Sequence, residues 1–155
     1  MPEFHYQFDV AAPAGAVNKF HHDSKVLQQL SPPPVFVQLH QIEPLAEGSL
    51  SQMTMWVGPI PLRWHARHEN VSDEGFTDVQ ERGPMALWRH THRFIANGPE
   101  RTTVQEHVQY EHPAGFRGLL TRLLFNSASL YLLFTYRQIV TRLALRRQAP
   151  APAKA

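Results

Sequence analysis

The chain has 155 residues, enough for one domain with a sizeable core, and the lack of cysteine excludes disulfides and thiol chemistry. Its formal net charge is only +2, but residues 1–111 hold all 13 acidic side chains, whereas residues 112–155 hold seven basic ones and no acid. No apolar run is long enough to span a bilayer, and the first residues lack the pattern of a signal segment. We therefore expect a cytoplasmic protein.

The N-terminal part predicts one strand and two short helices. Phe4–Val10 places an apolar side chain at every second position, as in a half-buried strand. Ala12-Pro13 can open a helix, because proline is tolerated in the first helical turn. A second helix, capped by Asp23 or Ser24, is expected to run to Leu30, where three prolines follow closely and end it.

Strands dominate the middle of the chain. Six are predicted, separated by turns rich in Gly, Pro, Asp and Asn, at Val35–Ile42, Ser49–Val57, Leu62–Ser72, Phe76–Gln80, Met85–Ala96 and Thr102–Glu111. Consecutive strands joined by short turns indicate an antiparallel meander.

The C-terminal part changes to helical spacing. Residues 115–147 predict one long helix, with an interruption expected near 126–129, where helix propensity is lower. The predicted domain therefore spans residues 1–147, and residues 148–155 are expected to form a disordered Pro/Ala tail.

Two neighbouring strands carry the most informative side chains. Alternation in the first of them separates arginines from a second set, which consists of Trp88, His90, His92 and Phe94. The arginines fit the solvated face, so the second set should face the interior. The next strand places Val104, Glu106, Val108 and Tyr110 on one face. An apolar face with two histidines and a glutamate is typical of the wall of a ligand cavity.

Turn lengths predict how these faces meet. A five-residue loop at residues 97–101 places His92 opposite Glu106 and Trp88 opposite Tyr110. Side chains that are directly opposed in this way are close enough to form hydrogen bonds.

The preceding pair of strands extends the polar row. A three-residue loop at Asp73–Gly75 pairs Ser72 with Phe76, which places Asn70 opposite Asp78 and His68 opposite Gln80. The polar side chains expected on the concave face are then His68, Asn70, Asp78, Gln80, His90, His92 and Glu106.

The order β-α-α-β6-α, with a long helix held by a curved sheet, resembles the START-like helix-grip (SRPBCC) superfamily. Local strings are similar to its bacterial polyketide cyclase/dehydrase-like members, namely Phe76-x-Asp78-x-Gln80, Gly83-Pro84, Trp88-x-His90-x-His92-x-Phe94, Val108-x-Tyr110-x-x-Pro113-x-Gly115 and Phe134-x-Tyr136-Arg137. The resemblance covers about residues 1–145. It implies an α+β fold in which a seven-stranded antiparallel sheet wraps around the C-terminal helix.

The same resemblance implies a cavity between sheet and helix for an apolar or amphipathic ligand. Its expected lining combines the polar row with apolar side chains of the sheet, which are Trp64, Phe76, Trp88, Phe94, Val104, Val108 and Tyr110. The helix is expected to add Leu119, Leu120, Leu123, Leu130, Phe134 and Tyr131. Residues of both sets could instead fill one closed core.

Two functions are consistent with this lining. The first is binding of a lipid- or polyketide-like molecule without chemistry. The second is catalysis as a polyketide cyclase/dehydratase. In that case His90 or His92 would move a proton, and Asp78 or Glu106 would tune the pKa of that histidine. Tyr110 or Arg137 would then polarise a substrate oxygen. The polar row could also be a structural network that satisfies its own buried groups.

Other functions have weaker support. His90, His92 and Glu106 are the only plausible trio for zinc, and we expect no native metal and no cofactor. We take His21-His22 to be a solvated helix end. Phosphate loops and dinucleotide fingerprints are absent from the sequence, and nucleic-acid binding is not expected.

The expected partners are a hydrophobic ligand and, weakly, an anionic membrane surface. The basic C-terminal helix would contact that surface, chiefly through Arg142, Arg146 and Arg147. The alternative is that these arginines simply suit the helix dipole. A monomer and a homodimer both remain open.

Overall fold

A computed structural model describes residues 1–23 and 25–148. Its elements are β1 (Glu3–Val10), α1 (Ala14–His22), α2 (Val26–Gln29), β2 (Val35–Ile42), β3 (Leu50–Val57), β4 (Ile60–Ser72), β5 (Gly75–Arg82), β6 (Leu87–Ala96), β7 (Thr102–Glu111), α3 (Gly115–Leu124) and α4 (Ser127–Gln148). Every predicted strand is present, most within two residues of its predicted bounds. The predicted tail lies outside the described residues, apart from Gln148, whose backbone is still helical.

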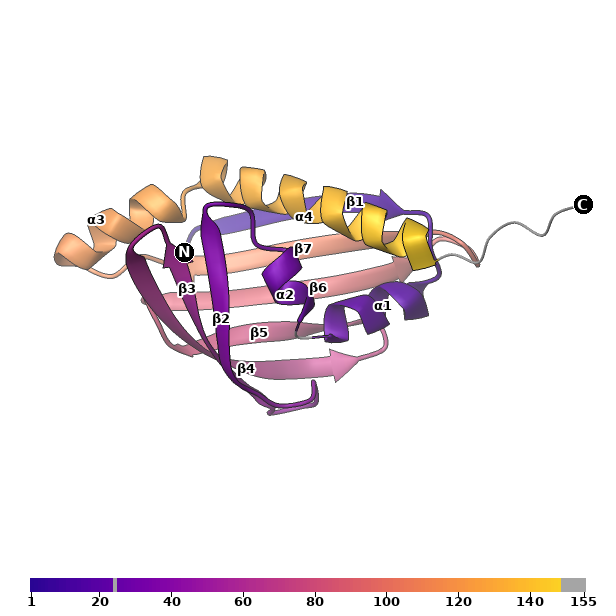
Figure 1. Cartoon of the computed structure of the whole chain (residues 1–155), viewed down its shortest axis with the longest axis horizontal. Coiled ribbons are helices and arrows are strands. Elements are labelled where there is room, and N and C mark those ends of the chain that lie inside the picture. Colours follow the sequence, from indigo (N-terminus) through magenta and orange to yellow (C-terminus); the bar gives the residue numbers. More distant parts are fainter. Residues whose placement is uncertain (24, 149–155) are drawn as a thin grey trace, which may run out of the picture.

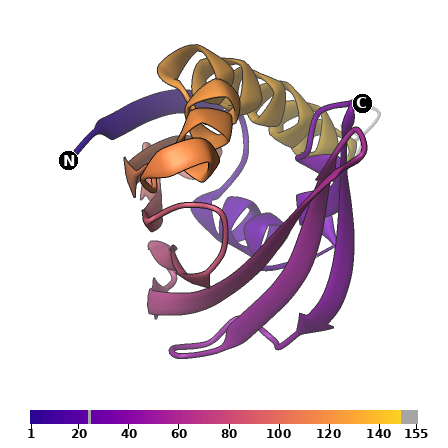
Figure 2. The same ribbon diagram turned by 90° about the vertical axis from the view of Figure 1, so that its left-hand side faces the viewer.

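All seven strands form one antiparallel sheet in the order β1-β7-β6-β5-β4-β3-β2. The sheet is an uninterrupted meander from β2 to β7, as the sequence predicts, and β1 pairs with β7 at its edge. It curves strongly, and α1, α2 and α4 lie on its concave side (Figures 1 and 2). The predicted α+β class and seven-stranded helix-grip architecture are thereby confirmed.

The predicted β6–β7 register is confirmed, and Asp78 lies on the face of His90, as expected. His92 lies opposite Glu106 and Trp88 opposite Tyr110 in the β6–β7 pair. Asp78 lies opposite His90 in the β5–β6 pair. These registers bring the polar side chains of three adjacent strands to one face.

The predicted β4–β5 register is wrong. Ser72 pairs with Gly75 instead of Phe76, and His68 lies opposite Asp78 instead of Gln80. A bulge after Glu69 places two residues of β4 opposite one of β5. Asn70, with φ of 53°, occupies this bulge and is exposed, so it does not belong to the concave polar row.

Helix α4 supplies the helical side of the core. Its residues Leu130, Phe134, Thr141 and Leu145 are buried at spacings of four or seven, which place them on one helical face toward the sheet. The predicted interruption before this helix is confirmed. Asn126 stands between the two helices, and its side-chain oxygen accepts a hydrogen bond from the Ser129 backbone at 3.0 Å.

Helix α3, the part before the interruption, corrects the prediction that this segment lines the cavity. It extends beyond the end of the sheet (Figure 1). Leu119 and Leu123 are exposed on it, and Tyr131 is exposed at the start of α4, so none of the three lies in the interior. No helix within residues 1–23 and 25–148 is long and apolar enough to cross a membrane.

Candidate functional site

A cavity of about 170 Å³ lies between the concave face of the sheet and the helices α1, α2 and α4. Met53, Met55, Trp64, Trp88 and Phe125 form an apolar part of its wall. The polar part consists of His21, His68, Asp78, His90, His92 and Arg137. The remaining lining comes from the segment of α1 and α2, from β2 to β5, from the loop after β2 and from α4. It comprises His22, Asp23, Val26, Leu27, Leu30, Ile42, Glu43, Leu45, Ser51, Ala66, Phe76 and Leu133.

Five buried or half-buried side chains form a continuous polar chain along the concave wall. We call it the His–carboxylate chain, and its members in order are His90, Glu106, His92, Asp78 and His68. Glu106 Oε2 lies 2.7 Å from His90 Nε2 and 2.8 Å from His92 Nδ1. Asp78 continues the chain, with one oxygen 3.3 Å from His92 Nε2 and the other 3.2 Å from His68 Nε2. The His92 Nδ1 contact lacks hydrogen-bond geometry, so we treat it as an ion pair.

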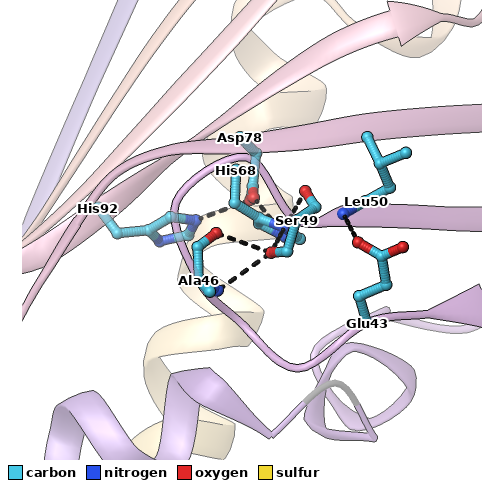
Figure 3. A network of polar contacts seen from close by, with 7 residues as sticks. All are labelled: Glu43, Ala46, Ser49, Leu50, His68, Asp78 and His92. Atoms are coloured by element: carbon cyan, nitrogen blue, oxygen red, sulfur yellow. Dashed lines mark hydrogen bonds and ion pairs between the residues drawn. The ribbon is translucent and has the colours of Figure 1, made fainter.

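The loop between β2 and β3 anchors one end of this chain (Figure 3). The Ser49 hydroxyl donates to the Ala46 carbonyl at 2.8 Å, so it can only accept from His68 Nδ1, 3.0 Å away. The Ser49 carbonyl also accepts from His68 Nδ1 at 3.0 Å. His68 Nδ1 therefore carries a hydrogen atom, which points toward Ser49. The other ring nitrogen, Nε2, faces the Asp78 carboxylate. The side chain of Glu43 accepts from the Leu50 backbone and fixes the same loop.

The surrounding charges give His90 and His92 different charge states. Burial disfavours the imidazolium of His92, but Glu106 and Asp78 outweigh that effect and raise its pKa to about 9. Burial would likewise raise the pKa of Glu106, yet His92 and His90 hold it well below its ordinary value. His92 is therefore a cation held between two carboxylates at neutral pH.

His90 stays neutral beside it. Burial, and then repulsion from His92, lower its pKa to about 4, even though Glu106 favours the charged form. Burial also lowers the pKa of His21 to about 4. Arg137 is the second cation of the cavity, and its guanidinium lies 5.3 Å from the Phe134 ring centre. Glu106 and Asp78 favour the charged form of Arg137, which burial disfavours.

The structure brings together about half of the predicted ligand-binding side chains. Those that line the cavity are Trp64, His68, Phe76, Asp78, Trp88, His90 and His92. Phe94, Val108, Tyr110, Leu130 and Phe134 are buried in the core around it and are not part of its lining. Glu106 lies behind the two histidines. Gln80 is bonded through both side-chain atoms to the Met85 backbone, so it braces the turn before β6.

Several lining residues were not predicted. His21 and His22, taken as a solvated helix end, line the cavity, and His21 Nδ1 bonds to the Val17 carbonyl at 2.8 Å. The apolar edge of α2 and the two methionines of β3 also reach the lining. The alternation of Met53 and Met55 along β3 could have indicated that they face the interior. How α1 and α2 pack over the sheet cannot be inferred from a sequence pattern.

The site also contains a possible metal-ligand set. Asp78, His90 and His92 place donor atoms within 4.8 Å of one another, and Asp78 stands in this set where Glu106 was predicted. The same atoms are engaged with each other and with Glu106 in the His–carboxylate chain. A metal would have to replace those contacts, so the geometry favours a polar network.

Comparison with known proteins gives structural neighbours. No protein-family model and no curated protein matches the chain. Among solved structures, the Zhui aromatase/cyclase from Streptomyces sp. R1128 has a TM-score of 0.77 at 15% identity, over 99% of both chains. A START superfamily protein from Mycobacterium smegmatis has a TM-score of 0.71 at 9% identity, over 95% of this chain and 99% of that one.

A third neighbour is norcoclaurine synthase from Thalictrum flavum, solved in complex with dopamine and hydroxybenzaldehyde. Its TM-score is 0.68 at 18% identity, over 96% of this chain and 89% of that one. At identities this low, the three neighbours establish the fold of this chain and leave its chemistry to be argued from the cavity.

Proposed function

We propose that this chain, which has the START-like helix-grip fold, binds a compact amphipathic molecule in the cavity between its sheet and α4. The observation that carries the proposal is the division of the cavity wall. Trp64, Trp88 and the two methionines offer apolar surface, whereas the His–carboxylate chain and Arg137 offer hydrogen-bonding groups. Ligand sites commonly combine an apolar lining with a few placed polar groups.

The volume of the cavity limits the size of the ligand. An apolar cavity of about 150 Å³ accommodates benzene, so about 170 Å³ suits one substituted ring or a short chain. A larger lipid- or polyketide-like molecule would have to extend out of the cavity, and Asp23 is a lining residue that is exposed to solvent.

The charge balance limits the polar group of the ligand. The two carboxylates of the His–carboxylate chain both contact His92, and the charge of Arg137 acts on them at longer range. A further full charge would have to be desolvated without an opposite charge, which is unfavourable. A hydroxyl or carbonyl group is therefore the best-suited ligand group.

Binding of an environment-sensitive apolar fluorophore tests the proposal. Ala66→Leu adds volume inside the lining and should weaken binding by roughly tenfold or more, because overfilling a packed site is costly. Leu123→Glu, on the exposed side of α3, is the control and should bind as the wild type does. Equal affinity of Ala66→Leu and wild type, or loss of binding in Leu123→Glu, would contradict the proposal.

Acid–base catalysis on a bound carbonyl compound, as in a cyclase or dehydratase, is the second candidate. It is favoured by the neutral His90 beside the cationic His92, since the first can accept a proton and the second can donate one. Arg137, which lines the cavity, is better placed than the non-lining Tyr110 to polarise a substrate oxygen. Ligands that displace the fluorophore can be followed for conversion. Conversion that persists unchanged in His90→Ala and His92→Ala would remove this candidate.

A further inference from the structure

Helix α3 carries its large apolar side chains on its outer surface. Phe116, Leu119 and Leu123 follow the i, i+3, i+7 spacing of one helical face, and 81%, 66% and 69% of their respective surfaces are exposed. The opposite face packs against the protein through the small residues Gly118 and Thr121. A side chain at position 118 would lie 1.9 Å from the carbonyl oxygen of Pro113, just before the helix, so glycine is required there.

The surroundings of this stripe are basic. Residues 112–148 contain six arginines and no acidic residue. At 100° per residue, Arg117 and Arg122 fall on the two sides of the apolar stripe, and both are exposed. Arg142, which we expected to contact a membrane, is instead bonded to the Asp9 carbonyl at 2.8 Å and lies over the Phe8 ring. Arg146 and Arg147 are exposed at the end of α4, whereas on α3 exposed arginines flank a stripe of exposed apolar side chains.

We propose that α3 is a docking surface for an anionic lipid bilayer. Phe116, Leu119 and Leu123 enter the boundary between headgroups and acyl chains, and Arg117 and Arg122 bind lipid phosphates. A helix with an apolar stripe between basic flanks is suited to lying in a membrane interface. A second copy of the chain is a poorer occupant. Two α3 surfaces placed face to face would bring arginines together without a compensating acid from residues 112–148.

Docking has a consequence for the cavity, and this consequence rests on the proposed function. Phe125, directly after α3, packs with its ring centre 6.2 Å from that of Trp64 and 5.7 Å from that of Trp88. All three side chains line the cavity. A docked α3 therefore places the aromatic part of the cavity near the bilayer, where an amphipathic ligand would be concentrated.

Cosedimentation with vesicles tests the docking surface. The wild-type chain should bind vesicles that contain phosphatidylglycerol in preference to phosphatidylcholine alone, and salt should weaken binding. Phe116→Glu should abolish binding. Phe36→Glu, which alters a phenylalanine that is 62% exposed on β2, is the matched control and should keep it. Arg117→Gln and Arg122→Gln should each weaken binding by roughly fivefold.

Absence of wild-type binding, equal binding to both lipids, or wild-type binding by Phe116→Glu would each overturn the docking surface. A dimer that Phe116→Glu disrupts, without vesicle binding, would assign the stripe to a second copy and also overturn the proposal. The fluorophore assay separates this inference from the proposed function. Phe116→Glu should bind the fluorophore normally, and a wild-type chain that binds vesicles but no fluorophore would refute only the ligand cavity.

Discussion

Glu106 is the residue on which the state of the His–carboxylate chain depends. It is buried, it contacts both His90 and His92, and it is a main reason why the pKa of His92 rises against the effect of burial. Its position was predictable, because strict alternation in β6 and β7 and a five-residue loop set which side chains oppose each other. His21 and Arg137 were harder to place, since a helical residue's surroundings depend on how its helix packs.

These pKa shifts predict a defined pH dependence of stability. His92 has a folded-state pKa of about 9, above its ordinary value of 6.5. Its contribution to the free energy of unfolding is therefore complete below pH 6.5 and is lost as the pH rises through 9. The loss amounts to about 3 kcal/mol. His90 and His21, lowered to about 4, contribute above pH 6.5 and lose that contribution as the pH falls toward 4. The histidines together therefore favour a maximum near pH 6.5.

Denaturant unfolding from pH 4 to 9.5, repeated in Glu106→Gln, measures this dependence. The variant should be destabilised by about 3–5 kcal/mol near pH 7, because a buried ion pair loses one partner. Its loss of stability above pH 6.5 should also be smaller, since His92 keeps only Asp78. Glu111→Gln, exposed on the same strand, should follow the wild-type curve. A wild-type free energy of unfolding that rises from pH 6.5 to 9 would refute the charge assignment.

At the scale of elements, the hairpin between β4 and β5 shows what a sequence pattern leaves open. The strands themselves were predictable from alternation, but the bulge at Asn70 is a change of register that depends on the turn geometry. The two-residue turn begins β5 at Gly75, directly beside β6. A side chain at position 75 would lie 2.0 Å from the His92 carbonyl oxygen. Glycine therefore sets how closely β5 approaches the strand that carries the two central histidines.

A pair of glycine substitutions tests this contact. Gly75→Ala combines a strained backbone, with φ of 144°, and a clash with β6. Gly98→Ala has a comparable φ of 118° but nothing within 4 Å of the added carbon. Gly75→Ala should therefore be less stable than Gly98→Ala by about 1–3 kcal/mol, the usual cost of overpacking. If Gly75→Ala and Gly98→Ala had equal midpoints in thermal or denaturant unfolding, β5 would not approach β6 this closely.

Over the whole molecule, element order and the family resemblance it supports predicted the architecture but not the cavity. A β-α-α-β6-α order with short turns permits few topologies, and the resemblance implied the seven-stranded sheet with the helix on its concave side. The cavity volume depends on side-chain packing and on where the terminal helix breaks. The break before α4 turns Leu119 and Leu123 outward, and α1 and α2 supply lining in their place. The ligand is consequently expected to be smaller than the resemblance alone implied.

Histidine and tryptophan NMR signals, recorded while compounds are added, test the central claim most directly. The compounds are single-ring aromatic alcohols and ketones. At least one should shift the ring signals of His90 or His92 together with the indole signals of Trp64 or Trp88, with one shared concentration dependence. Ala66→Leu should show neither change. Shifts confined to exposed rings such as His5, or cavity signals that respond to none of the compounds, would contradict an amphipathic ligand site between the sheet and α4.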